Sequence, residues 1–298
     1  MQNVAKINLE LEHCTDCPYC RKPDGYAEYY CQHDLKTPGV GVGDGSAVPD
    51  FCPFVIQRLQ TVLKTIEESG EGTIPKKFIK QVERKQKDDP NEKFGADHSW
   101  RHIRRVSEIG MDFLEHCVAY GYSSADTVLK EKLLLQIAAY LHDIGLADSA
   151  NNHDIHSAEL AKKYLSGPKV DIDLEDAYTI VHAVANHSDG KEMNTIVDVA
   201  LILADKLDVT ADRIVRVTDK ITAECMKIQA TEFKLHGKLM KAERAELRYT
   251  VDKGFDLSIF KAWPKAIKIP YRVATEYLGL KDFRFFVNDE QIELKTVI

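Results

Sequence analysis

The sequence predicts a mainly α-helical protein with a small cysteine-rich segment at its N-terminus and an α+β module at its C-terminus. Cysteine, glycine and proline are frequent in the first 52 residues, with little periodicity. Apolar residues then recur at helical spacing to about residue 228, and their period changes to two after residue 245. Because 298 residues exceed the usual size of a single core, we expect more than one compact unit.

Residues 1–52 are predicted to fold around a metal ion. Five of the seven cysteines lie between residues 14 and 52, and "HCTDCPYC" has C-x2-C-x2-C spacing. Such a knuckle with two distant thiolates is typical of a structural zinc site, which can supply the folding free energy that a short segment lacks. The expected ligands are Cys14, Cys17, Cys31 and Cys52, with Cys20 or His33 as substitutes. An iron–sulfur cluster and uncoordinated thiols are the alternatives.

Residues 53–96 are expected to form a helix and a charged linker. Pro53 suits a first helical turn, apolar residues follow at helical spacing, and Gly70 is a stop signal. The next stretch, "KKFIKQVERKQKDDPNEK", is dominated by charge, so we predict a solvent-exposed helix followed by a linker.

Residues 97–228 are predicted to form a bundle of at least five helices. The helical segments are "DHSWRHIRRVSEIGMDFLEHCVAY", "SADTVLKEKLLLQIAAYLHDIG", "HDIHSAELAKKYLSGP", "LEDAYTIVHAVANHSDG" and "TIVDVALILADKLDVTADRIVRV". Gly145 and Gly167 stand where helices are expected to end.

Residues 229–298 are predicted to form a ββαββ module. "AELRYTVDKGFDLSIF" alternates apolar and polar residues on both sides of Asp252-Lys253-Gly254, which is typical of a hairpin. A short helix, "YRVATEYLG", ends at Gly279. "FRFFVNDEQIEL" is a second hairpin that turns at Asn288-Asp289.

The helical block carries histidines and aspartates on or beside the apolar parts of its helices. Burying such groups is costly unless they are paired, hydrogen-bonded or bound to a metal. Their nitrogen and oxygen donors suit Mn, Fe, Co, Ni or Zn. The candidate ligands are His102, His142, Asp143, His156, His187 and Asp205. His153 could replace His156, and His182 could replace His187; His98 and His116 are expected at the surface or behind the ligands.

Residues 97–212 resemble the HD-domain metal-dependent phosphohydrolases. "HIRRV", "LHDIG", "HSAELA", "AVANHSDG" and "ILADKLD" appear in the order and approximate spacing of that family. The resemblance implies an HD-type helical bundle in which His102, His142, Asp143 and Asp205 bind a metal. It also implies that His156 and His187 mark a dinuclear branch, in which Asp143 bridges two ions.

The implied activity is hydrolysis of a nucleotide or another small phosphate ester by a metal-activated hydroxide. Two ions about 3.5 to 4 Å apart can share a hydroxide and neutralise the leaving oxygen. Asp143 and His142 are the expected catalytic residues, and Arg105 and Lys206, with Arg101 as a further candidate, are the cations expected near the anionic substrate.

Departures from the family pattern argue against two substrate classes. The cyclic-dinucleotide branch has lysine after "HDIG", and the alarmone hydrolases have "HDxxED"; here Leu146 and Ala147 stand at those places. A mixed-valent di-iron oxygenase and a regulatory ligand-sensing module without turnover are the alternative functions.

Composition predicts a cytoplasmic protein, and the resemblance implies a small phosphorylated substrate as its partner. No apolar run approaches the roughly 20 residues needed to cross a bilayer, and the first residues lack the features of a secretory signal. The net charge of −7 gives no strong signal for nucleic-acid binding. Whether the protein forms a homo-oligomer is left open.

Overall fold

The computed structural model describes residues 20–21, 30–31, 40–41, 52–68, 75–88 and 95–297. The chain divides into two compact units, residues 1–57 and 58–298. In the first unit, β1 (Cys20–Arg21), β2 (Tyr30–Cys31) and β3 (Val40–Gly41) form an antiparallel sheet.

Half of the predicted zinc ligands fall outside the described residues. Cys14, Cys17 and His33 lie outside them. The backbones of Cys20 and Cys31 face each other across β1 and β2, and Cys52 is buried just before α1 (Pro53–Glu68). The zinc site therefore stays a prediction.

The charged helix of the expected linker is amphipathic. The α2 helix (Lys76–Asp88) packs Phe78 and Val82 against Leu146 and Ala147. Lys85 Nζ also donates to the carbonyl oxygen of Leu146 at 3.4 Å. The expectation of a solvated helix was wrong for this face, because two apolar residues four apart are enough to bury one side of a charged helix. As a result, α2 covers the turn that follows His142 and Asp143.

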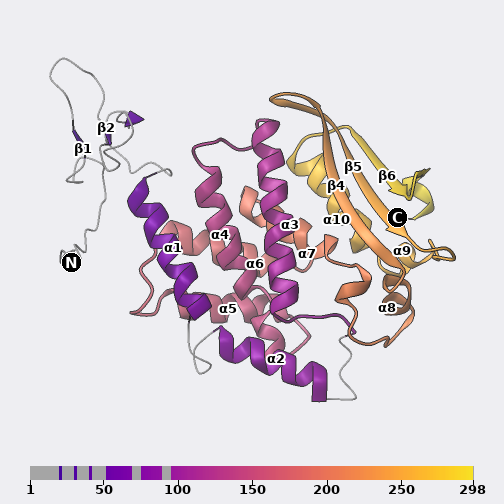
Figure 1. Cartoon of the computed structure of the whole chain (residues 1–298), viewed down its shortest axis with the longest axis horizontal. Coiled ribbons are helices and arrows are strands. Elements are labelled where there is room, and N and C mark those ends of the chain that lie inside the picture. The colour runs from indigo at the N-terminus through magenta and orange to yellow at the C-terminus, as the bar shows by residue number, and fades with distance from the viewer. Residues whose placement is uncertain are drawn as a thin grey trace. The chain divides into compact units, whose positions relative to one another are not determined.

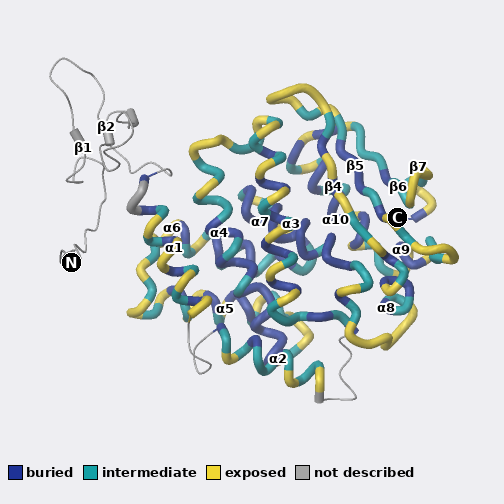
Figure 2. Tube along the Cα trace, viewed as in Figure 1, coloured by how far each residue is buried: buried dark blue, intermediate teal, exposed yellow. Residues whose placement is uncertain are grey.

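The helical bundle confirms the predicted fold class. Its long helices are α3 (Trp100–Ala119), α4 (Val128–Leu141), α5 (His153–Leu165), α6 (Leu174–Asn186) and α7 (Ile196–Leu207), followed by the short α8 (Lys220–Cys225). The α7 helix is buried along nearly its whole length and contacts α3, α4 and α6 (Figure 2). Thr195 and Asp198 cap its N-terminus reciprocally in a capping box. The bundle is therefore built around α7.

The C-terminal sheet differs from the prediction in its first hairpin. The sheet order is β4 (Ile228–Lys238), β5 (Lys241–Val251), β6 (Asp282–Val287) and β7 (Glu290–Ile292), with β5 and β6 parallel. The β4–β5 hairpin turns at Leu239-Met240, whereas residues after Gly254 lead into α9 (Ile259–Ala262). Polar residues along β4 hide its period in the sequence, and Phe260 packs on Tyr249 and Phe285 from a helix instead of a strand.

The remaining predictions for the module are confirmed. The second hairpin turns at Asn288, which has a φ of 52° as a tight hairpin turn requires. The predicted helix consists of α10 (Lys265–Arg272) and a π-helical turn (Val273–Tyr277), and the chain reverses at Gly279 with a φ of 68°.

The C-terminal module packs onto the helical bundle. The α10 helix lies between β5 and α7, with the Tyr249 hydroxyl donating to the carbonyl oxygen of Ala266 at 3.3 Å (Figure 1). On β4, the Phe233 ring lies 6.0 Å from the Phe113 ring of α3, and Thr231 Oγ1 donates to the carbonyl oxygen of Leu207. The module therefore contacts α3 and α7 of the bundle.

Within the described part of the chain, no helix combines the length and the apolar character that a membrane span requires.

We predict that Gly145→Ala destabilises the protein by about 1 to 3 kcal/mol, the usual cost of overpacking. A methyl group there would collide with the carbonyl oxygen of His153 and lie 2.6 Å from the Ser157 nitrogen, both on the α5 backbone. Urea unfolding measures the effect. Gly167→Ala is the control, because its methyl would lie 3.0 Å from the carbonyl oxygen of Tyr164. Equal loss in both variants would contradict this account.

Candidate metal centre

The ends of several helices meet at one buried group of histidines and aspartates. His142 caps the C-terminus of α4, and Asp143 follows it at the start of a 3-10 turn (Ile144–Ala147). His102 lies in the first turns of α3, and His187 caps α6. The apolar residues of α4 are buried against the other helices, so the His142-Asp143 pair is held at a fixed end of a core helix.

The Asp143 carboxylate lies at the middle of this group. Its Oδ2 atom is 3.1 Å from His142 Nε2 and 3.4 Å from His102 Nε2. Its Oδ1 atom is 3.5 Å from His187 Nε2 and 3.6 Å from His153 Nε2. One carboxylate therefore separates two pairs of imidazoles, one on each oxygen.

Each pair brings two imidazole nitrogens face to face. His102 Nε2 lies 3.0 Å from His142 Nε2, and His153 Nε2 lies 3.1 Å from His187 Nε2. Asp205 adds a carboxylate to the first pair, with Oδ1 at 3.4 Å from His102 Nε2.

The other ring nitrogens determine the tautomers. The Nδ1 atoms of His142, His153 and His187 lie 2.8, 3.2 and 2.7 Å from the backbone carbonyl oxygens of Ala139, Ala150 and Val184. A carbonyl oxygen only accepts, so these Nδ1 atoms carry the protons. In the neutral rings, the Nε2 atoms therefore present lone pairs to the centre. Facing lone pairs repel unless a cation or a proton lies between them, so both pairs are suited to a cation.

The donor set fits divalent metal ions. Imidazole nitrogen together with carboxylate oxygen suits first-row transition metals. Three sets of side chains place their donor atoms within 4.8 Å of one another: His98 with His102 and Asp143, His102 with His142 and Asp205, and His142 with Asp143 and His187. The geometry thus brings together five of the six predicted ligands.

His156 is the predicted ligand that the structure does not bring to this group. Its side chain is 43% exposed and faces Glu159, with Nδ1 at 3.9 Å from Oε2. His153, one turn earlier on α5, occupies the place expected for it. His156 was preferred because it directly precedes "SAELA", but α5 begins at His153, and a helix start one turn earlier exchanges the two residues.

His182 and His116 lie away from the centre. His182 Nδ1 contacts Asp198 Oδ1 at 3.1 Å and its Nε2 contacts Glu192 Oε2 at 3.1 Å. His116 lies at the surface, 4.0 Å from Asp112.

His98 is closer to the centre than the sequence indicates. Its Nδ1 lies 2.5 Å from Asp143 Oδ2. Burial lowers the pKa of His98 to about 4, although Asp143 opposes this shift, so the ring is neutral and Nδ1 donates. The available signal was the spacing: His98 precedes His102 by four residues.

A second set of charges supports His102 from behind. Asp208 Oδ2 accepts from His102 Nδ1 at 2.7 Å. Arg105 Nε donates to the other oxygen of Asp208 at 2.7 Å, and Arg213 Nη1 lies 3.3 Å from Asp205 Oδ1. The Arg105 guanidinium thus binds Asp208, which joins it to His102, and its expected role near an anionic substrate stays a prediction. Asp208 and Arg213 were not predicted.

The other predicted cations differ in their placement. Lys206 Nζ lies 2.5 Å from Asp205 Oδ2, at the edge of the centre. Arg101 is largely exposed and pairs with Asp97 at 3.3 Å. Lys206 is thus the predicted cation that directly contacts a candidate ligand.

The charges of the centre are strongly coupled. Burial and Arg213 oppose protonation of His102, but hydrogen bonds to Asp143, Asp205 and Asp208 raise its pKa to about 9. Burial opposes ionisation of Asp143 and Asp205, yet the surrounding histidines hold the pKa of Asp143, and Lys206, His102 and Arg213 hold the pKa of Asp205, well below the usual range. At neutral pH His102 therefore carries a proton, and its positive charge balances the carboxylates as a bound metal ion would.

Residues 95–224 match the family model of the HD domain. This segment is an HD domain. The matched residues run from just before α3 through most of α8 and include all the donors described above. HD domains are typical of metal-dependent phosphohydrolases and bind divalent metal through such histidines and aspartates. No curated protein matched the chain.

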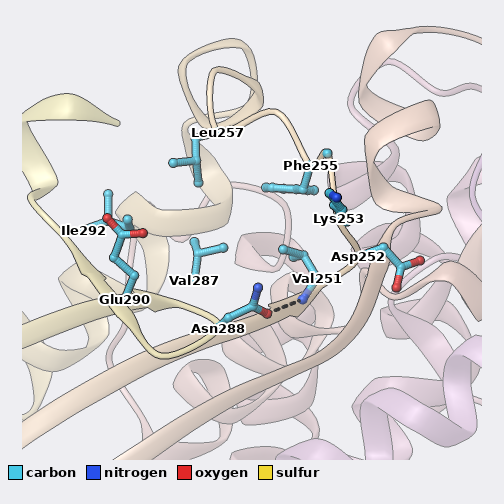
Figure 3. A pocket seen from close by; sticks show the side chains of 10 residues that line it. Val251, Asp252, Lys253, Phe255, Leu257, Val287, Asn288, Glu290 and Ile292 are labelled. Atoms are coloured by element: carbon cyan, nitrogen blue, oxygen red, sulfur yellow. Dashed lines mark hydrogen bonds between the residues drawn. The ribbon is translucent and has the colours of Figure 1, made fainter.

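A pocket in the C-terminal sheet is separate from the centre of the HD domain. It has a volume of about 210 Å³ and lies between the turn after β5 and the β6–β7 hairpin, with Phe255, Leu257, Val287 and Ile292 among its lining residues (Figure 3). Asn288 Oδ1 accepts from the Val251 nitrogen at 2.9 Å and joins the two turns. None of the lining residues belongs to the His/Asp group.

We predict that the metal affinity of the HD domain rises with pH from 6 to 8, by up to about tenfold per unit. A metal binds neutral imidazole, so it must displace the proton that His102 retains up to a pKa of about 9. Manganese titrations in matched buffers measure the affinity. An affinity that stays constant between pH 6 and 8 would contradict the assigned protonation of His102.

Proposed function

We propose that the protein is a metal-dependent phosphohydrolase with two divalent ions, which cleaves a nucleotide or another small phosphate ester. The observation that carries the proposal is the position of the Asp143 carboxylate between two pairs of facing imidazole nitrogens. A site for a single ion would not need a second pair of imidazole nitrogens beside the other oxygen of the same carboxylate.

The donors divide into two ligand groups that share Asp143. We assign His102, His142 and Asp205 to one ion and His153 and His187 to the other. Bound divalent ions lower the pKa of a coordinated water toward neutrality and offset charge on the phosphoryl oxygens. Mn, Fe, Co, Ni and Zn all accept this donor set.

The protein groups around the ligands keep this geometry. Asp208 holds the Nδ1 proton of His102, so that Nε2 faces the centre, and Arg105 and Arg213 hold Asp208 in turn. His98 donates to Asp143 Oδ2 and orients that carboxylate. Lys206 holds the second oxygen of Asp205, leaving Oδ1 toward His102. Each ligand is thus oriented by a neighbour before any ion binds.

We predict that His153→Ala reduces the number of bound ions from two to one and removes activity, whereas His156→Ala keeps both. The two residues lie one turn apart on α5, so each variant controls for the effect of the other on the helix. Elemental analysis after dialysis, together with circular dichroism, measures ion content and folding. If His156→Ala loses an ion and His153→Ala does not, the second ligand group is wrong.

A substrate panel tests the proposed reaction. Protein loaded separately with Mn, Co, Ni or Fe should release phosphate from a phosphomonoester, a dinucleotide or a cyclic nucleotide, and Asp143→Asn should abolish the release. Asp212→Asn is the control, because this carboxylate is exposed on a turn that follows α7.

Two results would contradict the proposed function. Iron-loaded protein that consumes oxygen without releasing phosphate would favour the di-iron oxygenase. Fully loaded protein that leaves the whole panel intact, and whose cellular role persists in the double variant His142→Ala, Asp143→Ala, would favour a regulatory module.

A further inference from the structure

The C-terminal module places a lysine next to the metal centre. Lys265, the first residue of α10, donates from Nζ to the carbonyl oxygen of Ser188 at 3.3 Å. Ser188 follows His187 in the chain, and its hydroxyl lies 3.2 Å from His153 Nε2. Lys265 therefore contacts the residue that links His187 to His153, although Lys265 is outside the HD domain match.

Among the residues that the structure describes, no carboxylate forms an ion pair with Lys265. The neighbouring lysines differ: Lys206 pairs with Asp205 at 2.5 Å and Lys191 with Asp189 at 3.3 Å. Two carboxylates, Asp189 and Asp154, lie near enough to raise the pKa of Lys265. Asp189 pairs with Lys191, and Asp154 accepts from the backbone nitrogen of Ile155. Lys265 thus contributes a positive charge that the protein itself does not neutralise by direct contact.

The surroundings of Lys265 favour an added anion. Lys265 is exposed, as Lys268 is, but partial desolvation of its ammonium group, and then repulsion from Lys206, lower its pKa. An anion bound at the Lys265 ammonium group offsets this repulsion, and a dianion does so more strongly than a monoanion.

The position of Lys265 is held by α10 and its neighbours. Arg272, at the other end of α10, donates from Nη1 to the carbonyl oxygen of Gly190 at 2.8 Å and pairs with Glu276 Oε2 at 2.8 Å. The two ends of α10 thus bind the chain at Ser188 and Gly190, directly after His187. The α10 helix packs on α7, with Ala266, Ile267 and Ile269 buried.

We propose that α10 completes the substrate site and that Lys265 binds the phosphoryl group of a phosphomonoester dianion. The reaction in which this group takes part rests on the proposed function, whereas the anion site itself does not. The C-terminal module then has a defined role: it supplies substrate-binding charge to a centre whose ligands all come from the HD domain.

Calorimetric titration of the manganese-loaded protein with inorganic phosphate tests the site. Lys265→Ala should weaken phosphate binding roughly tenfold, since hydrogen bonds to charged groups contribute on this order. Lys265→Arg should retain most of the affinity. The control is Lys268→Ala, an exposed lysine on the same helix, which should bind phosphate within about twofold of the wild type. Manganese content should be equal in all four proteins.

The result that would overturn the proposal is equal phosphate affinity in Lys265→Ala and the wild type, or equal weakening in Lys268→Ala. Dimethyl phosphate, a monoanionic diester, should bind more weakly than phosphate; equal binding would overturn the monoester assignment.

On a cleaved substrate, Lys265→Ala should raise KM more than it lowers kcat, and an unchanged kcat/KM would overturn the proposal while leaving the proposed function intact.

Failure of the proposed function has a different signature. If no ester is cleaved but phosphate binding still depends on Lys265, the anion site is supported and the hydrolase assignment is wrong.

Discussion

The buried carboxylate of Asp143 is the group on which the arrangement of the centre depends. A carboxylate removed from water is costly unless cations or hydrogen-bond donors surround it. Here His142 and His102 approach one oxygen, and His153 and His187 approach the other. The low pKa of this carboxyl shows that its surroundings favour the charged form, so its negative charge can hold cations on both sides.

The fold holds the side chains around Asp143 in place, because each of them lies near the end of a packed helix. The α4 and α7 helices are core elements, and the short turn after Asp143 is covered by α2. Gly145 allows α5 to approach that turn closely, which brings His153 to the centre. The C-terminal module adds α10 against α7 and binds the chain after His187. Parts distant in sequence thus stabilise one site.

Much of the fold and the centre could be predicted because periodicity and costly buried groups are visible in the sequence. The helices of the bundle and His102, His142, Asp143, His187 and Asp205 were predicted from this pattern. The sequence could not decide between His153 and His156, because a shift of one turn in the start of α5 exchanges the two residues. The roles of Arg105, Asp208 and Arg213 depend on contacts between α3 and the chain after α7, and β4 is disguised by its polar residues.

Anomalous diffraction from crystals grown with manganese tests the central claim most directly. The account predicts two peaks about 3.5 to 4 Å apart, with Asp143 between them. One ion should bind His102, His142 and Asp205, and the other should bind His153 and His187. A single peak, or a second ion bound by His156, would contradict the account.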